Sequence, residues 1–287
     1  MTAITTAPPT PSPLVLRRPA ARSIVAPLAT LTRRRFALSA HTPREIVVPL
    51  MTPILFSVVI APALAKVTGA IHGIDYMSFV AIGTVGLLVP LNCMFAGIGV
   101  IVDRQSGARR DLLAAPVPRS LIVFGNLAVA LSISAFQVVA LFVAAVLRGA
   151  QFDARPTGVV FFAAAAVLLA VAMYGGAEIL ANRISKQEEY IGAVPAIAIV
   201  PWFFAGSLFP ISALPTFLGA FAKVLPLTHA LAVMRYGLLD GRATGLHDIW
   251  GMTNATAMAA LSLLVVAAYA ALLLSLSVRV FSRAAVK

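Results

Sequence analysis

The sequence predicts an all-α polytopic membrane protein with six transmembrane helices and an N-terminal interfacial helix. Three observations support this fold class: 60% of the 287 residues are hydrophobic, only 11% are charged, and the mean hydropathy is +0.96. A soluble domain carries about 25% charged residues, far more than this chain. The apolar residues are gathered in runs long enough to cross the roughly 30 Å apolar core of a bilayer.

The basic excess and the single cysteine exclude several classes of function. A net charge of +12 would suggest nucleic-acid binding in a soluble protein. Here the basic residues flank apolar runs, where they orient spans and contact anionic lipid headgroups, so we expect no nucleic-acid partner. Cys93, inside an apolar run, is the single cysteine of the sequence. A single cysteine excludes disulfides within the chain and cysteine-based metal sites.

Two segments precede the membrane domain, which comprises residues 46–287. Residues 1–23 are rich in Pro, Thr and Ala and hold three arginines but no acid, which predicts a disordered cytoplasmic tail. Residues 24–45 place apolar side chains near one side of a helix and Arg33, Arg34 and Arg35 on the other. This pattern is typical of an elbow helix lying in the membrane interface.

Six apolar runs define the predicted spans. They cover about residues 46–67, 78–102, 121–147, 159–182, 190–209 and 255–278. Pro49, Pro53 and Pro62 should bend the first span, which indicates that it packs inside a bundle where neighbours satisfy the freed carbonyls.

The distribution of basic residues orients these spans. Six spans put both termini on one side, and 16 of the 22 Lys and Arg residues fall on that side, which the positive-inside rule identifies as the cytoplasm. The six assigned to the outside are Lys66, Arg148, Arg155, Lys223, Arg235 and Arg242. We therefore expect a multi-pass protein of the plasma (inner) membrane with cytoplasmic termini.

The turn between the second and third spans is the most informative stretch. Gly107 is the expected break, residues 108–115 are long enough for about two helical turns, and Pro116 should end them. A short amphipathic helix there could receive a push from a soluble partner, and an ordinary basic loop that only sets topology is the alternative. The candidate residues are Asp103, Arg104, Gly107, Arg109, Arg110, Asp111, Leu112, Leu113, Pro116 and Arg119.

The connection between the fifth and sixth spans is the second informative stretch. Pro215 and Pro226 each open a helical pattern, which predicts two short, half-buried helices outside the membrane. They would form a lid over a dimer axis, or would serve only as interfacial anchors. The candidate lid residues are Phe209, Pro210, Leu214, Pro215, Pro226, Thr228, His229 and Arg235.

Sequence motifs for catalysis are missing from the chain. It contains no G-x-x-x-x-G-K-[ST] and no Gly-Lys pair, so it cannot cradle nucleotide phosphates as a P-loop does. The four histidines form no H-E-x-x-H pair, and no G-x-S-x-G elbow occurs. We expect no catalytic residue, metal or cofactor in this chain.

The candidate polar residues inside the predicted spans are Asn92, Gln137 and Glu178. Glu178 lies about one turn from the cytoplasmic end, where it could snorkel or pair with Arg183 or Lys186. An ion- or proton-coupled carrier that uses Glu178 is therefore an alternative function. An intramembrane enzyme acting on lipid is a further alternative, but it would need convergent His, Asp or Ser residues that the chain lacks.

At the two informative stretches the chain resembles permeases of the type-2 ABC exporter family, particularly the daunorubicin-resistance-type drug permeases. One match is Asp103 to Gly107 followed by Asp111 to Arg119, which is similar to the family's acid-x-x-x-Gly, leucine-rich, Pro-Val-x-Arg segment. The other runs from Phe209-Pro210 through Leu214-Pro215 to Pro226-Leu227-Thr228-His229-Ala230 and Arg235. The resemblance covers nearly the whole chain beyond the tail.

This resemblance implies a function and partners. The first inner turn would be the coupling helix that docks on a separate ATPase, present in two copies and carrying ATP and Mg. The outer helices would lie near the exit, and a second copy of the chain or a related permease would complete the pathway. The cargo would be a lipophilic or amphiphilic drug, antibiotic or lipid, although family members also move polysaccharides and lipid-linked glycans. Gln105 and Ala108-Arg109-Arg110 depart from the family pattern and bear on which ATPase surface is matched.

Overall fold

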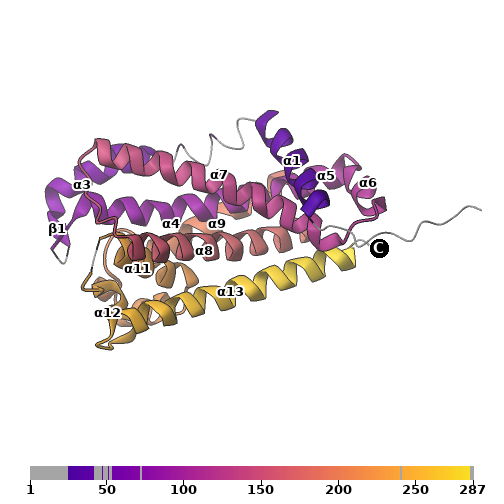
Figure 1. Ribbon diagram of the computed structural model, residues 1–287. Helices are drawn as coiled ribbons and strands as arrows, with labels where there is room; N and C mark the ends of the chain where they lie inside the picture. Colours follow the sequence, from indigo (N-terminus) through magenta and orange to yellow (C-terminus); the bar gives the residue numbers. More distant parts are fainter. Residues whose placement is uncertain are drawn as a thin grey trace, which may run out of the picture.

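The computed structural model describes residues 25–41, 47, 51, 54–71, 73–239 and 241–284, which form an elongated helical bundle (Figure 1). One end of the bundle carries the short helices α5 and α6, and we call it the α6 end. The opposite end carries two short strands, β1 and β2, and we call it the hairpin end. The predicted tail, residues 1–23, lies outside the described residues.

Helix α4 (Tyr76–Ala96) is the centre of the bundle. Nearly all of its side chains are buried, and it contacts α3, α7, α8, α9 and α11. Its sequence is apolar on every side, as expected for a helix enclosed by others. The Asp75 carboxylate caps its first turn by accepting a hydrogen bond from the Ser78 backbone N–H at 3.1 Å. Beyond Gly97, α5 (Ile98–Gln105) continues α4 toward the α6 end.

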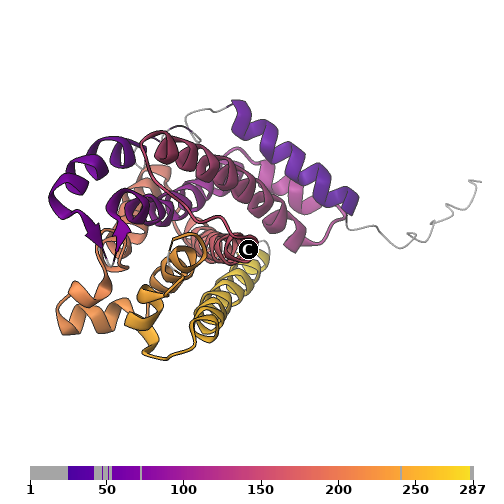
Figure 2. The ribbon, with the colours of Figure 1, turned by 60° about the vertical axis from the view of Figure 1, so that its left-hand side comes forward.

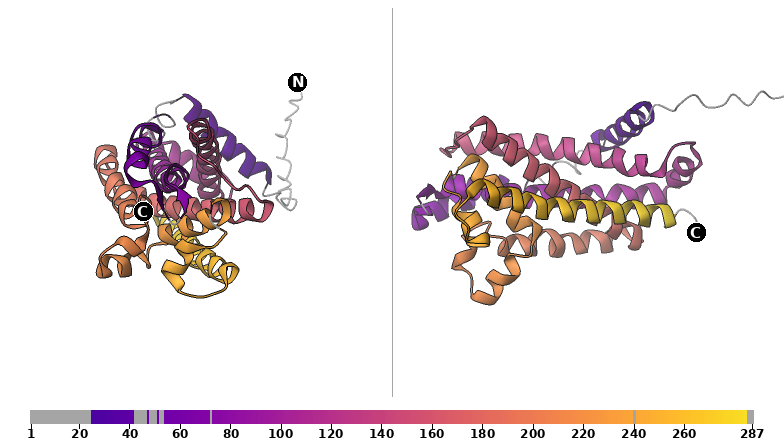
Figure 3. Two further views of the ribbon diagram at one scale, coloured as in Figure 1. Left: turned by 90° about the vertical axis from the view of Figure 1, so that its left-hand side faces the viewer. Right: turned by 60° about the horizontal axis from the view of Figure 1, so that its bottom comes forward.

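Three other long helices run along the length of the bundle (Figures 1 and 3). They are α7 (Arg119–Leu147), α8 (Pro156–Arg183) and α13 (Ala255–Ala284). Together with Tyr76–Gln105, these are the four helices of the described residues that are long and apolar enough to cross a membrane. They coincide with the predicted spans 78–102, 121–147, 159–182 and 255–278.

Helix α9 (Gln187–Phe204) occupies most of the predicted fifth span, 190–209, and contacts α4. It is followed by the 3₁₀ turn η2 (Ile211–Ala213) and by α10 (Thr216–Ala222), α11 (Pro226–Leu238) and α12 (Thr244–Trp250) (Figure 2). Pro215 directly precedes α10, and Pro226 is the first residue of α11. Because proline has no N–H to lose at a helix start, both helices begin where the sequence predicted.

The prediction of two half-buried outer helices is wrong for α11. Eleven of its residues are buried, and it packs against α4, α8 and α13. Helix α10 instead exposes its apolar side, with Phe217 72% and Phe221 53% exposed. The two helices meet at 81°, so they form a broken span or a re-entrant pair, and α12 is an additional helix that the sequence did not predict.

The N-terminal part of the described chain lies on the outside of this bundle. Helix α1 (Val25–His41) packs along α7 near the α6 end (Figure 2) and falls within the predicted elbow, 24–45.

At the hairpin end, a π-helical turn η1 (Phe56–Ile60) leads into α3 (Ala61–Thr68). These two elements fall in the predicted first span, 46–67, of which Pro49 and Pro53 lie outside the described residues.

A two-stranded antiparallel hairpin follows α3. Strands β1 (Ala70–Ile71) and β2 (Ile74–Asp75) pair Ala70 with Asp75 and Ile71 with Ile74. The sequence predicted only a short loop here. The hairpin is a small addition to an otherwise helical fold, and it delivers Asp75 to the start of α4.

Candidate functional site

The turn at the α6 end is built around a short helix. Gly107 adopts φ +81°, a left-handed conformation that glycine reaches without steric cost, and this breaks the chain after α5. Its carbonyl accepts a hydrogen bond from the Arg110 N–H at 2.9 Å, which opens α6 (Ala108–Ala114). Ala115 is extended, as expected for a residue before proline, so the helix ends at Ala114, two residues before Pro116.

Arg104 fastens this turn to the end of α8. Its guanidinium donates to the carbonyl oxygens of Ala181 at 3.3 Å, Asn182 at 3.5 Å and Ile184 at 2.5 Å. Ala181 and Asn182 lie in the last turn of α8, and Ile184 is its C-cap residue. Carbonyls at this position lack donors within the helix and lie at the negative end of the helix dipole. Gln105 adds a bond from its Nε2 to the Ser185 carbonyl at 3.2 Å. The turn that follows α5 and the turn that follows α8 are thereby held together.

Two arginines of α1 fasten the same turn from the other side. Arg34 pairs with the Asp103 carboxylate at 3.0 Å, and Asp103 is nearly buried. The Arg35 guanidinium is buried where Gly99 leaves room for it, since a Cβ at Gly99 would overlap it. The prediction placed these arginines on the polar side of an interfacial helix. In the structure they anchor that helix to the turn.

Arg109 and Arg119 contact the end of α13. The Arg109 guanidinium carbon lies 4.8 Å from the centroid of the Phe281 ring, and Arg119 donates to the Ser282 carbonyl at 2.9 Å. Burial lowers the pKa of Arg109, and the negative charge of Glu178 opposes this shift. Arg109 is 8% exposed, so it does not belong to the surface that α6 offers to a partner.

The exposed surface of α6 is correspondingly small. Arg110, Asp111 and Ala114 face outward, while Leu112 and Leu113 are half-buried against the core. The contacts of Asp103, Arg104 and Arg109 hold α6 in place, so the position of this exposed face is fixed relative to the bundle. It could accept a soluble partner with complementary charge.

Glu178 lies inside the bundle rather than at its edge. Its side chain is fully buried in α8 and accepts hydrogen bonds from the Tyr174 hydroxyl at 2.8 Å and the Asn182 amide at 3.2 Å. The expectation that it would snorkel or pair with Arg183 or Lys186 is wrong, because Tyr174 and Asn182 lie one turn away on the same helix face and bind it first.

Asn92 and Gln137 are also buried. Asn92 in α4 donates to the Ala130 carbonyl at 3.1 Å and to the Ser134 hydroxyl at 2.6 Å, both in α7. Hydrogen bonds of this kind join transmembrane helices. Asn92 and Glu178 therefore have separate partners and form no common site.

At the hairpin end, Arg235 joins three segments. Its guanidinium donates to the carbonyl oxygens of Gly206 at 2.7 Å and Ser207 at 2.9 Å, and lies 3.6 Å from the centroid of the Phe79 ring. A Cβ at Gly83 would overlap the Ser207 carbonyl, so that glycine allows the close approach. Arg235 thus ties α11 to α4 and to the end of α9.

His229 is part of a chain of hydrogen bonds in the same region. Its Nε2 lies 2.9 Å from the Lys223 carbonyl, which can only accept, so Nε2 carries the proton. Its Nδ1 lies 3.2 Å from the Ser262 hydroxyl, to which Trp250 donates at 2.8 Å. This chain joins α10, α11, α12 and α13.

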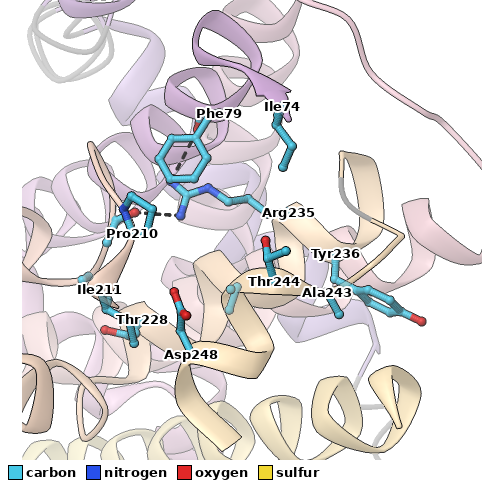
Figure 4. A pocket seen from close by; sticks show the side chains of 14 residues that line it. Ile74, Phe79, Pro210, Ile211, Thr228, Arg235, Tyr236, Ala243, Thr244 and Asp248 are labelled. Atoms are coloured by element: carbon cyan, nitrogen blue, oxygen red, sulfur yellow. Dashed lines mark hydrogen bonds between the residues drawn. The ribbon is translucent and has the colours of Figure 1, made fainter. Parts of the chain in front are cut away.

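A small space, lined by both apolar and polar side chains, lies between α11, α12 and η2 (Figure 4). Its volume is about 30 Å³, which is room for about two water molecules. The Thr228 hydroxyl and Arg235 Nε line it, are buried, and lack a hydrogen-bond partner in the described part of the chain. Asp248 completes it and accepts a bond from Ser212 at 3.0 Å. The space suits water and is too small for a drug-sized cargo.

The remaining predicted lid residues lie on or near the surface. Phe209 is 37% exposed, Pro215 is exposed, and Pro210 and Leu214 are half-buried. Pro226 sits at the start of the buried helix α11. Among the described residues, no three His, Cys, Asp or Glu side chains lie close enough together to hold a metal ion.

Comparison with known proteins identifies the family. The sequence model of the ABC-2 type transporter family matches residues 27–239, which includes both the α6 turn and α11. The chain belongs to this family. As an ABC-2 type transporter, it is a membrane permease component of an ABC exporter, a class that generally works with an ATPase partner and dimerises.

The chain is also similar to individual curated proteins. The chain is similar to the "Inner membrane transport permease YadH" of Escherichia coli K12, with 26% identity over 210 residues that cover 72% of this chain and 78% of that protein. It is also similar to "Nodulation protein J" of Sinorhizobium fredii, with 26% identity over 189 residues that cover 64% of this chain and 71% of that protein. These similarities support a transport subunit of the ABC-2 family.

The sequence did not point to several residues that hold the site in place. Arg35 and Trp202 are examples: Arg35 is buried beside Gly99, and the Trp202 indole donates to the Gly83 carbonyl at 2.7 Å. For Arg35 a signal was present, since a basic triplet inside a helix that is otherwise apolar calls for acceptors. For Trp202 no local pattern identifies the partner.

Proposed function

We propose that this chain moves a lipophilic or amphiphilic compound out across the plasma membrane, with energy from two copies of a separate ATPase that bind ATP and Mg. A second copy of the chain, or a related permease, would complete the pathway. Drugs, antibiotics and lipids are the expected cargoes, as in the daunorubicin-resistance-type permeases that the chain resembles.

The single observation that carries this proposal is the mounting of α6. Arg110 and Asp111 form its exposed face. Behind that face, Arg104 contacts the end of α8, Asp103 pairs with α1 and Arg109 contacts α13. A push on α6 would therefore reach α1, α8 and α13 together. Such a connection suits a subunit that is moved by a partner, because packed helices shift as bodies rather than bend.

The proposed topology has six spans. The described helices supply four, and we add α9 and the segment 46–67, part of which is described as η1 and α3. The α6 end would face the cytoplasm because most basic residues lie there, which also places both termini inside. Helices α10 and α12 would then lie at the outer surface.

The coupling role of α6 is tested with Arg110→Glu. Arg110 is exposed, so the variant should insert and fold normally while losing copurification with the ATPase and cargo-stimulated ATP hydrolysis. Arg279→Glu, at an exposed position near the same end of α13, is the matched control and should retain both. Normal transport by the Arg110→Glu variant in proteoliposomes would contradict the assignment.

The proposed cargo class follows from the polar groups of the spans. Asn92 and Glu178 are both bonded within the protein and are not offered to a hydrated cargo. This favours a lipophilic compound over a polysaccharide or glycolipid, the second cargo class that the family implies. Measuring ATPase stimulation of the purified complex by a lipophilic dye and by a lipid-linked glycan distinguishes the two.

A second candidate function is a proton-coupled carrier that uses Glu178. The observation in its favour is a fully buried carboxylate, which is rare and often functional in a membrane span. In that case Glu178→Gln abolishes transport, and vesicles that lack any ATPase accumulate cargo until a protonophore is added. In the exporter, the same vesicles are inactive without the ATPase.

A further inference from the structure

An open apolar groove runs between α7 and α8 at the hairpin end, and its volume is about 480 Å³. We call it the α7–α8 groove; its walls include Val139, Val143 and Val146, and its floor includes Phe142, Phe152 and Phe162. The geometry points to a binding site for one acyl chain of an anionic phospholipid, whose head group lies at Arg148 and Arg155.

The side chains at the floor of the groove pack against one another, while those of its walls are exposed. Phe142 lies edge-to-face against Phe152, with ring centroids 4.8 Å apart, and against Phe162 at 5.3 Å. Val139, Val143 and Val146 are 62%, 55% and 55% exposed. An apolar concave surface with a fixed floor favours an apolar chain that lies along it.

The length of the groove matches one leaflet. It follows α7 from Val138 to Leu147, about ten residues, which at 1.5 Å per residue is about 15 Å. Half of the roughly 30 Å apolar core of a bilayer is the same depth. A lipid tail fills this length, whereas a helix of a second copy of the chain would need a contact face along the whole span.

Two residues that line the groove, Leu147 and Ala154, are each followed in sequence by an arginine. Arg148 follows directly after α7, and Arg155 directly precedes α8; both are exposed. Asp153 pairs with Arg155 at 2.8 Å, whereas Arg148 makes only a long bond, 3.5 Å, to the Val58 carbonyl. Arginine at this depth attracts a lipid phosphate, and Arg148 should contribute more than Arg155 because no carboxylate is paired with it in the described part of the chain.

The site does not depend on the proposed transport function, because it requires only that α7 and α8 span a membrane. Under the proposed topology the groove faces the outer leaflet. A lipid bound there would cover the exposed valines and fill the space between the ends of the two helices.

The test uses the full chain in nanodiscs of equimolar phosphatidylglycerol and phosphatidylcholine, followed by native mass spectrometry of the lipid that the released protein retains. Wild type should retain phosphatidylglycerol preferentially. Arg148→Gln should lower this preference about fivefold, while Lys223→Gln, which removes an exposed cation from the same end, should leave it unchanged. Val143→Trp should fill the groove and reduce the total lipid retained, while Leu272→Trp on the exposed face of α13 should not.

Three results would overturn the proposal. One is an unchanged lipid preference in Arg148→Gln, a surface variant that should fold normally. Another is an equal loss of lipid in Val143→Trp and Leu272→Trp. The third is a cross-linked dimer from Val143→Cys treated with a bifunctional thiol reagent in membranes, since native Cys93 is buried and a link through position 143 would show that a second copy covers the groove.

Discussion

Replacing Arg235 with alanine should be among the most destabilising single changes at the hairpin end. The change removes donors from the carbonyl oxygens of Gly206 and Ser207, at 2.7 and 2.9 Å, and removes the cation from the Phe79 ring. Arg235 is only 8% exposed, so bulk water cannot readily replace it. The neighbouring space of about 30 Å³ could supply one or two water molecules as partial compensation.

The loss of unfolding free energy in Arg235→Ala can be bracketed from the two hydrogen bonds and the cation–π contact that the change removes. Hydrogen bonds between membrane helices contribute about 0.6 kcal/mol on average, whereas a buried carbonyl left without a donor costs about 1–3 kcal/mol. Two hydrogen bonds at the average value and a cation–π contact of about 1 kcal/mol give about 2 kcal/mol, whereas two carbonyls without a donor and a contact of about 2 kcal/mol give about 8 kcal/mol. For a chain of this size that range corresponds to a fall in the unfolding midpoint of roughly 5–25 °C. Arg235→Lys should lose about half as much, because an ammonium keeps the charge but cannot bridge both carbonyls.

Cys93 provides the assay. It is the single cysteine of the chain and is buried in α4, so a thiol-reactive fluorophore should label it only as the bundle opens on heating in detergent. Lys223→Ala, at an exposed position of the same end, is the control and should shift the midpoint by less than a degree or two. The reasoning is refuted if Arg235→Ala melts together with wild type, or if Lys223→Ala falls as far.

Three further predictions use the same labelling assay or hydrogen exchange. Arg104→Ala should speed amide exchange in residues 183–189, because the last carbonyls of α8 lose their donors at a cost of about 1–3 kcal/mol, and Arg183→Ala should not; equal exchange in the two variants would contradict this. Tyr174→Phe should lower the unfolding free energy by about 1.5–3 kcal/mol, because the buried Glu178 carboxylate loses one donor. This loss should be smaller in a Glu178→Gln background, and an unchanged loss there would contradict a role for the carboxylate charge. Trp202→Phe should cost about 1 kcal/mol through the bond to the Gly83 carbonyl, and no shift in the midpoint would rule that contribution out.

Hydropathy and helix punctuation predicted much of this fold. The spans at 78–102, 121–147, 159–182 and 255–278 are helical, since runs of that length and composition have few alternatives. Helix α6 was also predictable, because Gly107 and Pro116 mark its two ends through backbone geometry alone. Both cases depend on residues that are close in sequence.

The burial of α11, and the distant glycine that makes room for Arg35, could not be predicted from the sequence. Thr228, His229 and Arg235 give α11 a polar appearance, yet His229 and Arg235 are bonded to groups in other segments, which only the tertiary structure brings near. Arg35 is buried because Gly99, more than sixty residues away, leaves space for it. Local patterns reveal that a side chain is polar, but not whether distant partners will satisfy it.

The enclosure of α4 limits how this protein can change shape. A helix contacted on every side cannot spin about its own axis without disrupting five neighbours at once. Because α5 extends α4 and leads directly into α6, a displacement of α6 would tilt α4 together with the helices packed against it, as one rigid body. In the proposed exporter, distances between spin labels on α4 and α8 should therefore stay constant through a transport cycle, while distances to the proposed second protomer change.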